Sequence, residues 1–452
     1  MKKNTYTRRQ ALAATGAGVI GTMAASMGPV RAFDISHPKK DKLAINGGDP
    51  VRDKEWPAWP VWDQAAEEGV ISMLRTGNWW RGDGGHVEEF EKKYAQLLGA
   101  NHCVATSSGT TALQTALQVL GVDAGDEVIV SPYTFIASYN VIFLNKALPV
   151  FVDTNPETFL IDTDKIEERI TDRTTALLPV HIFGMPVEMD KVNAIAKKKG
   201  LKVVEDACQA WLSEYKGKKA GTLGDLGCFS FQNSKHLPSG EGGAIVGADE
   251  NLLDRCYALH NSGRGRGTFT GDSPIFTRGS NRRMQQIQGL ILMSQMKRLE
   301  ADSEKRWQNA KYLDERLAEI PGIIPCKMTA GATKSSYHLY PFRYKKEEFN
   351  DVSRSTFLKA LSAEGISNYS GYGPQYKYGI MDEALNSRGY KRLYGEKRLK
   401  QYREELVFPG NDQLCEEAVC LFQNMLLGSK QDMDDIVNAI KKIHDNKGKL
   451  AG

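Results

Sequence analysis

Seven short apolar runs between residues 102 and 247 constrain the fold more than any other feature of this sequence. Each run is four to six residues long, and helical or turn-rich stretches separate most of them. The runs are HCVAT, EVIVS, LPVFVD, ALLPVH, KVVED, CFSF and GAIVG. Most are too uniformly apolar for a strand with one solvent-facing side, so they predict a mostly parallel sheet that is covered on both faces. In such α/β sheets, ligands bind at the carboxyl ends of the strands.

Two chemically active residues follow two of these runs. Asp206 ends the run KVVED, and Lys235 follows the run CFSF, just before the glycine-rich loop SGEGG. Taken singly, Asp206 is a candidate helix cap and Lys235 a candidate solvated loop charge. Together they match what pyridoxal phosphate needs. The lysine amine forms a Schiff base with the aldehyde of this cofactor, and the carboxylate keeps its pyridine nitrogen protonated.

A third feature suits a phosphate group. The segment SSGTTALQTAL spaces its apolar residues as a helix does, and Ser108, Gly109 and Thr110 stand at the expected helix N-terminus. Free backbone N–H groups and the positive end of the helix dipole favour phosphate there. An ordinary helix cap is the alternative interpretation.

These segments resemble the DegT/DnrJ/EryC1/StrS family of sugar aminotransferases. EDACQA, GDLGCFSF, the lysine at 235 and GEGGAIV match the pattern of that family, and the resemblance runs from about Leu43 to the C-terminus. It implies the type I pyridoxal-phosphate-dependent transferase fold, which is an α/β fold. We therefore expect a linker over 33–42, a large domain with a seven-stranded, mostly parallel sheet over 43–317, and a smaller C-terminal α+β domain over 318–452.

The same resemblance implies roles for individual residues. Lys235 is the expected covalent anchor and then the general base, and Asp206 is the expected partner of the pyridine nitrogen. Asn281 is expected to reach the phosphate held by the other subunit of a homodimer. The other implied cofactor contacts are Gly109 and Thr110 at the phosphate, Phe135 stacked on the ring, Gln209 beside the ring and Ser230 at the phosphate. Packing in the core is the alternative for Phe135.

Four residues are candidates for contact with substrate: Tyr133, His181, Trp211 and Arg283. His181 is interpreted as either structural or lining the site. Arg283 belongs to GSNRRM, which resembles the Gly-x-Asn-x-Arg motif of the family. The chain departs from the family on the acceptor side, because Trp211 and Leu212 stand where small residues are usual. The aromatic loop GYGPQYKYG also lacks the Pro-x-His motif that family members often carry there.

The first 32 residues resemble a twin-arginine export signal. Arg8 and Arg9 precede a weakly apolar run that is rich in alanine and glycine, and Val30, Arg31 and Ala32 offer a cleavage site. The run is too short and too rich in glycine for a membrane span. We therefore expect a periplasmic protein that the twin-arginine machinery exports in folded form. A disordered or mis-started N-terminus is the alternative.

Charge and cysteine spacing argue against other classes of function. The chain of 452 residues has a formal net charge of +4, and it gives no reason to expect the concentrated basic patch that nucleic-acid binding needs. Its seven cysteines are scattered, and neither CxxC pairs nor histidine clusters give metal-ligand spacing. We expect neither a nucleic-acid partner nor a metal.

The sequence as a whole predicts an aminotransferase that moves an amino group from glutamate or glutamine to a keto sugar or keto cyclitol. AINGG, WPAWP and GSN resemble the inosose-aminotransferase and aminohydroxybenzoate-synthase branch of the family more than its nucleotide-sugar branch. The lysine at 235 argues against the dehydratases of the family, which have histidine there. The alternative is a periplasmic sugar-binding or sensory protein that keeps the cofactor without turnover.

Overall fold

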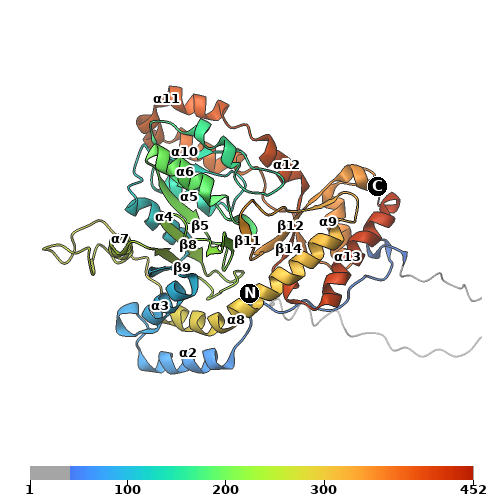
Figure 1. The fold of residues 1–452 in the computed structure, drawn as a ribbon, viewed down its shortest axis with the longest axis horizontal. Helices are drawn as coiled ribbons and strands as arrows, with labels where there is room; N and C mark the ends of the chain where they lie inside the picture. The colour runs from blue at the N-terminus through green and yellow to red at the C-terminus, as the bar shows by residue number, and fades with distance from the viewer. Residues whose placement is uncertain (1–40, 451–452) are drawn as a thin grey trace, which may run out of the picture. The chain divides into compact units, whose positions relative to one another are not determined.

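The main sheet has seven strands and is formed by the seven apolar runs (Figure 1). The structure is a computed structural model that describes residues 41–450, and these residues belong to one compact unit. The strands lie in the order β1-β9-β8-β5-β4-β2-β3. Their bounds are β1 His102–Thr106, β2 Glu127–Val130, β3 Leu148–Phe151, β4 Thr174–Leu178, β5 Lys202–Asp206, β8 Leu226–Ser230 and β9 Gly243–Gly247. β9 is antiparallel to β1 and β8, and the other pairs are parallel.

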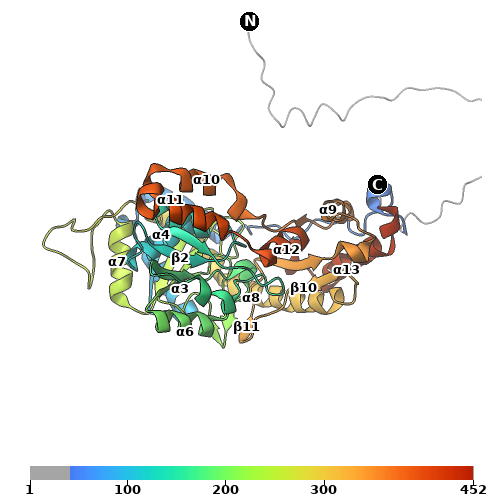
Figure 2. The same ribbon diagram turned by 90° about the horizontal axis from the view of Figure 1, so that it is seen from above.

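Helices cover both faces of this sheet, as the uniformly apolar strands predicted. Figure 2 shows α4 and α11 on one side of the sheet and α6 on the other. The helices are α2 Gln64–Thr76, α3 His86–Leu98, α4 Gly109–Val119, α5 Ala137–Leu144, α6 Met189–Lys199, α7 Glu250–His260, α8 Gln286–Leu317, α9 Arg354–Ala363, α10 Gly379–Asn386, α11 Arg388–Glu404, α12 Pro409–Glu417 and α13 Lys430–Asp445. The predicted α/β fold is confirmed.

The turn from β1 into α4 is closed by its own side chains. The Ser108 hydroxyl accepts a hydrogen bond from the Thr111 N–H at 3.1 Å, and the Thr111 hydroxyl accepts one from the Ser108 N–H at 3.0 Å. This reciprocal capping box fixes where the helix starts. The neighbouring strand begins at Gly243, where a Cβ atom would lie 2.3 Å from the Ser108 carbonyl oxygen. Glycine at 243 therefore lets β9 pack against the turn.

A second sheet follows the long helix α8. Its antiparallel strands lie in the order β10-β12-β14-β13, with bounds β10 Ile323–Pro325, β12 Leu339–Tyr344, β13 Asn368–Tyr369 and β14 Ala418–Phe422. A third sheet joins β11 Ala332–Lys334 to β6 Glu214–Tyr215 and β7 Lys218–Lys219. The third sheet pairs residues from both sides of position 317, and the domain boundary placed there stays a prediction.

The described residues also bear on membranes, metals and disulfides. Between residues 41 and 450, no helix is both long enough and apolar enough to cross a membrane. The same residues contain no group of three or more potential metal ligands. All seven cysteines are free thiols. The predicted export signal lies outside the described residues.

Candidate active site

A cavity of about 800 Å³ opens at the carboxyl ends of the central strands. It brings together Asp206 at the end of β5, Ser230 at the end of β8 and Lys235 in the loop beyond it. The β1–α4 turn contributes Gly109 and Thr110. Residues that the sequence places up to about 125 positions apart therefore share one chamber, which is the usual place for a ligand in an α/β sheet.

Asp206 is a buried carboxylate that is held on both oxygens. Its Oδ2 accepts a hydrogen bond from the Ser138 hydroxyl at 2.7 Å, and its Oδ1 accepts one from the Cys208 N–H at 3.1 Å. The Thr134 hydroxyl lies 2.7 Å from that of Ser138. Because the Ser138 hydroxyl uses its one hydrogen to donate to Asp206, Thr134 must be the donor in the bond between the two hydroxyl groups. This chain of hydrogen bonds fixes the orientation of the carboxylate in the cavity wall.

Lys235 extends its amine into the same cavity. The Trp59 indole N–H donates to the Lys235 carbonyl oxygen at 3.1 Å and fixes the backbone. Burial lowers the pKa of the Lys235 amine below its ordinary value, although Cys208 and Asp206 act in the opposite direction. A lowered pKa raises the neutral fraction of the amine, and the neutral amine is the form that acts as nucleophile and base.

The first turn of α4 suits a phosphate group. The first N–H groups of a helix have no partner inside the helix, and the N–H of Thr111 is already bound by Ser108. The N–H groups of Gly109 and Thr110 therefore remain for an anion at the positive end of the helix. A Cβ atom on Gly109 would lie 2.8 Å from the Ser230 Cβ and 2.9 Å from the Cys208 sulfur. The turn is thus a tight cradle, and the residues present fit the phosphate of pyridoxal phosphate.

Phe135 and Gln209 also line the cavity. Phe135 is 53% exposed, which excludes the core-packing alternative and leaves its ring free to stack on a ligand. Gln209 accepts a hydrogen bond from the Phe183 N–H at 2.8 Å and donates one to the Tyr372 hydroxyl at 2.9 Å. Gln209 therefore anchors Tyr372, from the aromatic loop, in the cavity wall.

His181 is a structural residue of this fold. It is fully buried, and its Nε2 donates to the Glu205 carboxylate at 2.9 Å. Its Nδ1 accepts from the Val187 N–H at 3.1 Å, which fixes the tautomer. Glu205 also accepts backbone N–H groups from the loop between β5 and β8. Of the two interpretations of His181, the structural one fits these contacts.

The structure does not place Tyr133 or Trp211 at the cavity surface, although both were candidates for substrate contact. Both are fully buried, and neither lines the cavity. Tyr133 accepts a long hydrogen bond from the Tyr372 N–H at 3.4 Å. The Trp211 ring lies 5.8 Å from the Lys235 amine. Both residues therefore support the wall from behind.

Asn281 and Arg283 lie away from the cavity of their own chain. Neither lines it, and Asn281 is exposed. The Arg283 guanidinium donates to the Asn261 side chain at 3.0 Å. The backbone next to them is tied to the phosphate turn, since the Ser107 N–H donates to the Arg282 carbonyl at 2.7 Å.

Sequence reasoning missed several residues that line this cavity. Ser138 orients Asp206, Tyr372 closes the wall, and His338 lies beside Lys235. Ser138 stands one helical turn after Thr134, a spacing that could have indicated a hydroxyl pair. His338 is 103 positions from Lys235, and no local pattern connects the two.

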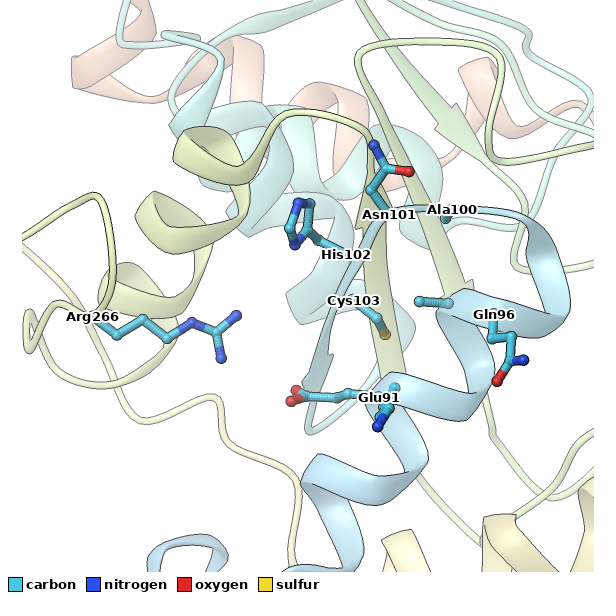
Figure 3. A pocket seen from close by; sticks show the side chains of 9 residues that line it. Glu91, Gln96, Ala100, Asn101, His102, Cys103 and Arg266 are labelled. Carbon is cyan, nitrogen blue, oxygen red and sulfur yellow. The ribbon is translucent and has the colours of Figure 1, made fainter.

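A second hollow of about 600 Å³ lies between α3, the start of β1 and Arg266 (Figure 3). Figure 3 shows the Arg266 guanidinium pointing toward this space, with Glu91 on the opposite side. Glu91 already binds Arg81 at 2.7 Å and accepts the Ala105 N–H at 2.5 Å. Asp254 likewise binds Arg266 at 2.9 Å. The charged groups around this second hollow are thus already paired within the protein. We therefore take the cavity with Lys235 as the candidate active site.

Comparison with known proteins agrees with this geometry. Residues 62–440 match the DegT/DnrJ/EryC1/StrS aminotransferase family. An L-glutamine:2-deoxy-scyllo-inosose aminotransferase of Micromonospora echinospora is 33% identical over 427 residues, covering 91% of this chain and 99% of that protein. Among solved structures, 3-amino-5-hydroxybenzoic acid synthase has a TM-score of 0.76 at 28% identity, covering 87% of this chain and 99% of that one. S. venezuelae DesV, solved in complex with a ketimine intermediate, has a TM-score of 0.73 at 27% identity, covering 86% and 99%.

Proposed function

Because the chain belongs to the DegT/DnrJ/EryC1/StrS aminotransferase family and is a pyridoxal-phosphate-dependent aminotransferase, we propose that it transfers the amino group of L-glutamine to a keto cyclitol. The observation that carries the proposal is the arrangement of Lys235, Asp206 and the Gly109–Thr110 turn in one cavity. The relatives named for glutamine and 2-deoxy-scyllo-inosose support this choice of donor and acceptor.

The cofactor supplies an aldehyde that condenses with amines and a ring that accepts electrons. Gly109, Thr110 and Ser230 would bind its phosphate through backbone N–H groups and a hydroxyl. Asp206 would hold a proton on the pyridine nitrogen, and Ser138 and the Cys208 N–H orient that carboxylate. Phe135 would pack against the ring.

Lys235 carries the proton transfer. Its amine, with a pKa lowered by burial, would take a proton from the α-carbon of the amino donor and later deliver one to the carbon that carried the cofactor's aldehyde. Asp206 and Lys235 approach the ligand from the ends of two adjacent strands, β5 and β8. The two residues therefore act at different atoms of one bound group, the ring nitrogen and the reacting carbon.

The part of the cavity that one chain supplies supports a cyclitol acceptor over a nucleotide sugar. Among the residues between 41 and 450 that line the cavity, Lys235 is the one lysine or arginine. A sugar nucleotide carries a diphosphate, which proteins commonly bind with several basic side chains. Asn233 instead offers an amide group that can hydrogen-bond hydroxyl groups, as do the Gln423 amide nitrogen and the Asn424 amide oxygen. The other polar atom of Gln423 binds Arg306, and that of Asn424 binds the Pro57 carbonyl.

A direct assay tests this proposal. Purified, cofactor-loaded protein is incubated with L-glutamine or L-glutamate and with 2-deoxy-scyllo-inosose, scyllo-inosose or a nucleotide-linked keto sugar, and amine products are measured by mass spectrometry. We expect glutamine with an inosose to give the highest kcat/KM. Turnover confined to the nucleotide sugar would contradict the choice of acceptor. Cofactor binding without any turnover would favour the binding or sensory alternative, to which the comparisons lend no support.

We also propose a homodimer in which each active site is built from both chains. Asn281 is exposed and lies outside its own cavity, so it is free to reach the phosphate site of a second copy. Trp79 and Trp80, which are 55% and 53% exposed, lie next to the segment that follows Asn281: the Gln286 N–H donates to the Trp79 carbonyl at 3.2 Å, and the Arg283 guanidinium lies 5.9 Å from the Trp80 ring. Burying such side chains against a second copy would stabilise the pair.

Export by the twin-arginine route remains our proposal for residues 1–32, supported by the arginine pair and the cleavage site in the sequence. Replacing Arg8 and Arg9 with lysine should retain the precursor inside the cell. Finding the wild-type protein in the cytoplasm with its N-terminus intact would argue against export.

A further inference from the structure

His338 lies beside the Lys235 amine, outside the group of residues that would hold the cofactor. It directly precedes β12, lines the same cavity as Lys235 and is 7% exposed. Its Nε2 lies 3.3 Å from the Lys235 Nζ. Its backbone N–H donates to the Phe183 carbonyl at 2.8 Å, which fixes the base of the side chain. A hydrogen bond between the two side chains is therefore built into the fold.

The surroundings keep the His338 imidazole neutral. Burial lowers its pKa well below the ordinary value, and the positive charges of Lys235 and Arg306 lower it further. A neutral imidazole has one N–H and one nitrogen lone pair. A protonated Lys235 amine can only donate, and a neutral amine can also donate. With its proton on Nδ1, the imidazole therefore accepts from Lys235 on Nε2 in both charge states of the amine.

Comparison with the neighbouring His236 shows that His338 does more than pack against an aromatic ring. His236 and His338 both pack against the Trp211 ring, with centroids 5.4 and 5.9 Å away. Within residues 41–450, the Nδ1 of His338 and both ring nitrogens of His236 are buried without a hydrogen-bond partner. His338 differs because its other nitrogen is directed at the Lys235 amine.

We propose that His338 is a positioning residue for Lys235, whose amine donates a hydrogen bond to the imidazole Nε2 and is thereby aimed at the α-carbon of the amino donor. A neutral amine has two N–H groups and one lone pair, so fixing one N–H restricts the direction of the lone pair. The lone pair forms the new N–H bond as the C–H bond of the donor breaks, and the electron pair left on carbon would be taken up by the cofactor ring. Lys235 would then pass the proton to the cofactor carbon that bears the transferred nitrogen. His338 neither gains nor loses a proton. The inference rests on the proposed aminotransferase function and adds the residue that orients its base.

The first test measures the pKa of Lys235 in cofactor-free protein, and so needs no substrate. Acetic anhydride labels the neutral amine, and mass spectrometry quantifies labelling of Lys235 against a reference amine across pH. The groups that face this pair are Asp206 and Cys208 around Lys235, and Arg306 and His236 around His338. The His338 variants leave all four of these groups unchanged, and the control variant changes only His236.

A hydrogen-bond acceptor favours the charged form of an amine, so its loss should lower the pKa of Lys235. We expect His338→Phe to raise labelling of Lys235 at fixed pH about tenfold. His338→Asn should do the same, because its amide does not extend to the Nε2 position, and this variant serves if the phenylalanine protein does not fold. His338→Gln places an amide oxygen near Nε2 and should stay close to wild type. His236→Phe is the matched control and should not shift the curve.

The second test follows the donor half-reaction of cofactor-loaded protein with L-glutamine. We expect His338→Phe and His338→Asn to lower kcat roughly a hundredfold with little change in KM, because a misdirected base slows the chemistry rather than binding. His338→Gln should recover most of this loss. Equal labelling curves in wild type and both disrupting variants, or an equal shift in His236→Phe, would overturn the inference. Inactivity of the wild type toward glutamine would instead overturn the proposed function, and the labelling result would still decide the role of His338.

Discussion

At the scale of single residues, the site depends on how two side chains are held. The Ser138 hydroxyl and the Cys208 N–H fix both carboxylate oxygens of Asp206, whereas burial lowers the pKa of Lys235. One group is thus a fixed hydrogen-bond acceptor, and the other is an amine whose neutral form is favoured. Such a pair can hold a proton at one atom of a ligand and remove a proton at another.

Replacing Ser138 with alanine tests this account of Asp206. Loss of a hydrogen bond to a charged group costs about 1.5–3 kcal/mol, so we expect kcat to fall roughly tenfold to a hundredfold while the cofactor still binds covalently. Steady-state kinetics and the absorbance of the bound cofactor give the two readouts. Ser131→Ala is the control, because Ser131 is also buried but binds the Thr154 hydroxyl at 3.1 Å instead of Asp206. Equal activity in both variants would remove Ser138 from this role.

At the scale of elements, the site depends on how closely α4 approaches β8 and β9. The helix begins one residue after Ser108, whose carbonyl lies where a Cβ on Gly243 would be. The Gly109 position is equally tight against Ser230 and Cys208. The phosphate turn is therefore fixed by packing before any ligand binds.

A methyl group on Gly109 should move this turn. Overpacking a tight position costs about 1–3 kcal/mol, so we expect Gly109→Ala to weaken cofactor binding about fivefold to a hundredfold. Titration of the cofactor-free protein with pyridoxal phosphate measures the effect. Gly379→Ala is a matched control, since Gly379 is also the first residue of its helix and a Cβ there meets nothing within 4 Å. An unchanged Kd for Gly109→Ala would contradict the claim that this tightly packed turn binds the phosphate of the cofactor.

The predictability of these elements follows from the length and burial of each segment. The seven strands of the main sheet were predictable because each is an apolar run. β6, β7 and β11 are two or three residues long and carry no periodic pattern. In the site, Asp206 ends one strand and Lys235 follows another, so the sequence indicates them. Ser138 and His338 become neighbours of the site only through tertiary folding.

At the scale of the whole molecule, the proposed dimer makes one prediction. Lys235→Ala removes the anchor, and Asn281→Asp places a negative charge against the phosphate. If the two variants are mixed by unfolding and reassembly, about half of the dimers carry one chain of each kind. In such a dimer, one site receives both changes and the other is intact. About a quarter of the wild-type activity should therefore return. Activity no higher than that of the two parents, with mixed dimers verified by mass, would contradict a shared site.

The central claim is that Lys235 is the covalent anchor and base of an aminotransferase, and borohydride reduction tests it most directly. The reduction fixes the bound cofactor to the amine that holds it, and peptide mapping by mass spectrometry then identifies that amine. We predict that the cofactor is found on Lys235, in the peptide that follows β8, and that Lys235→Ala protein retains none of it after reduction. Recovery of the reduced cofactor on a different lysine would contradict the account.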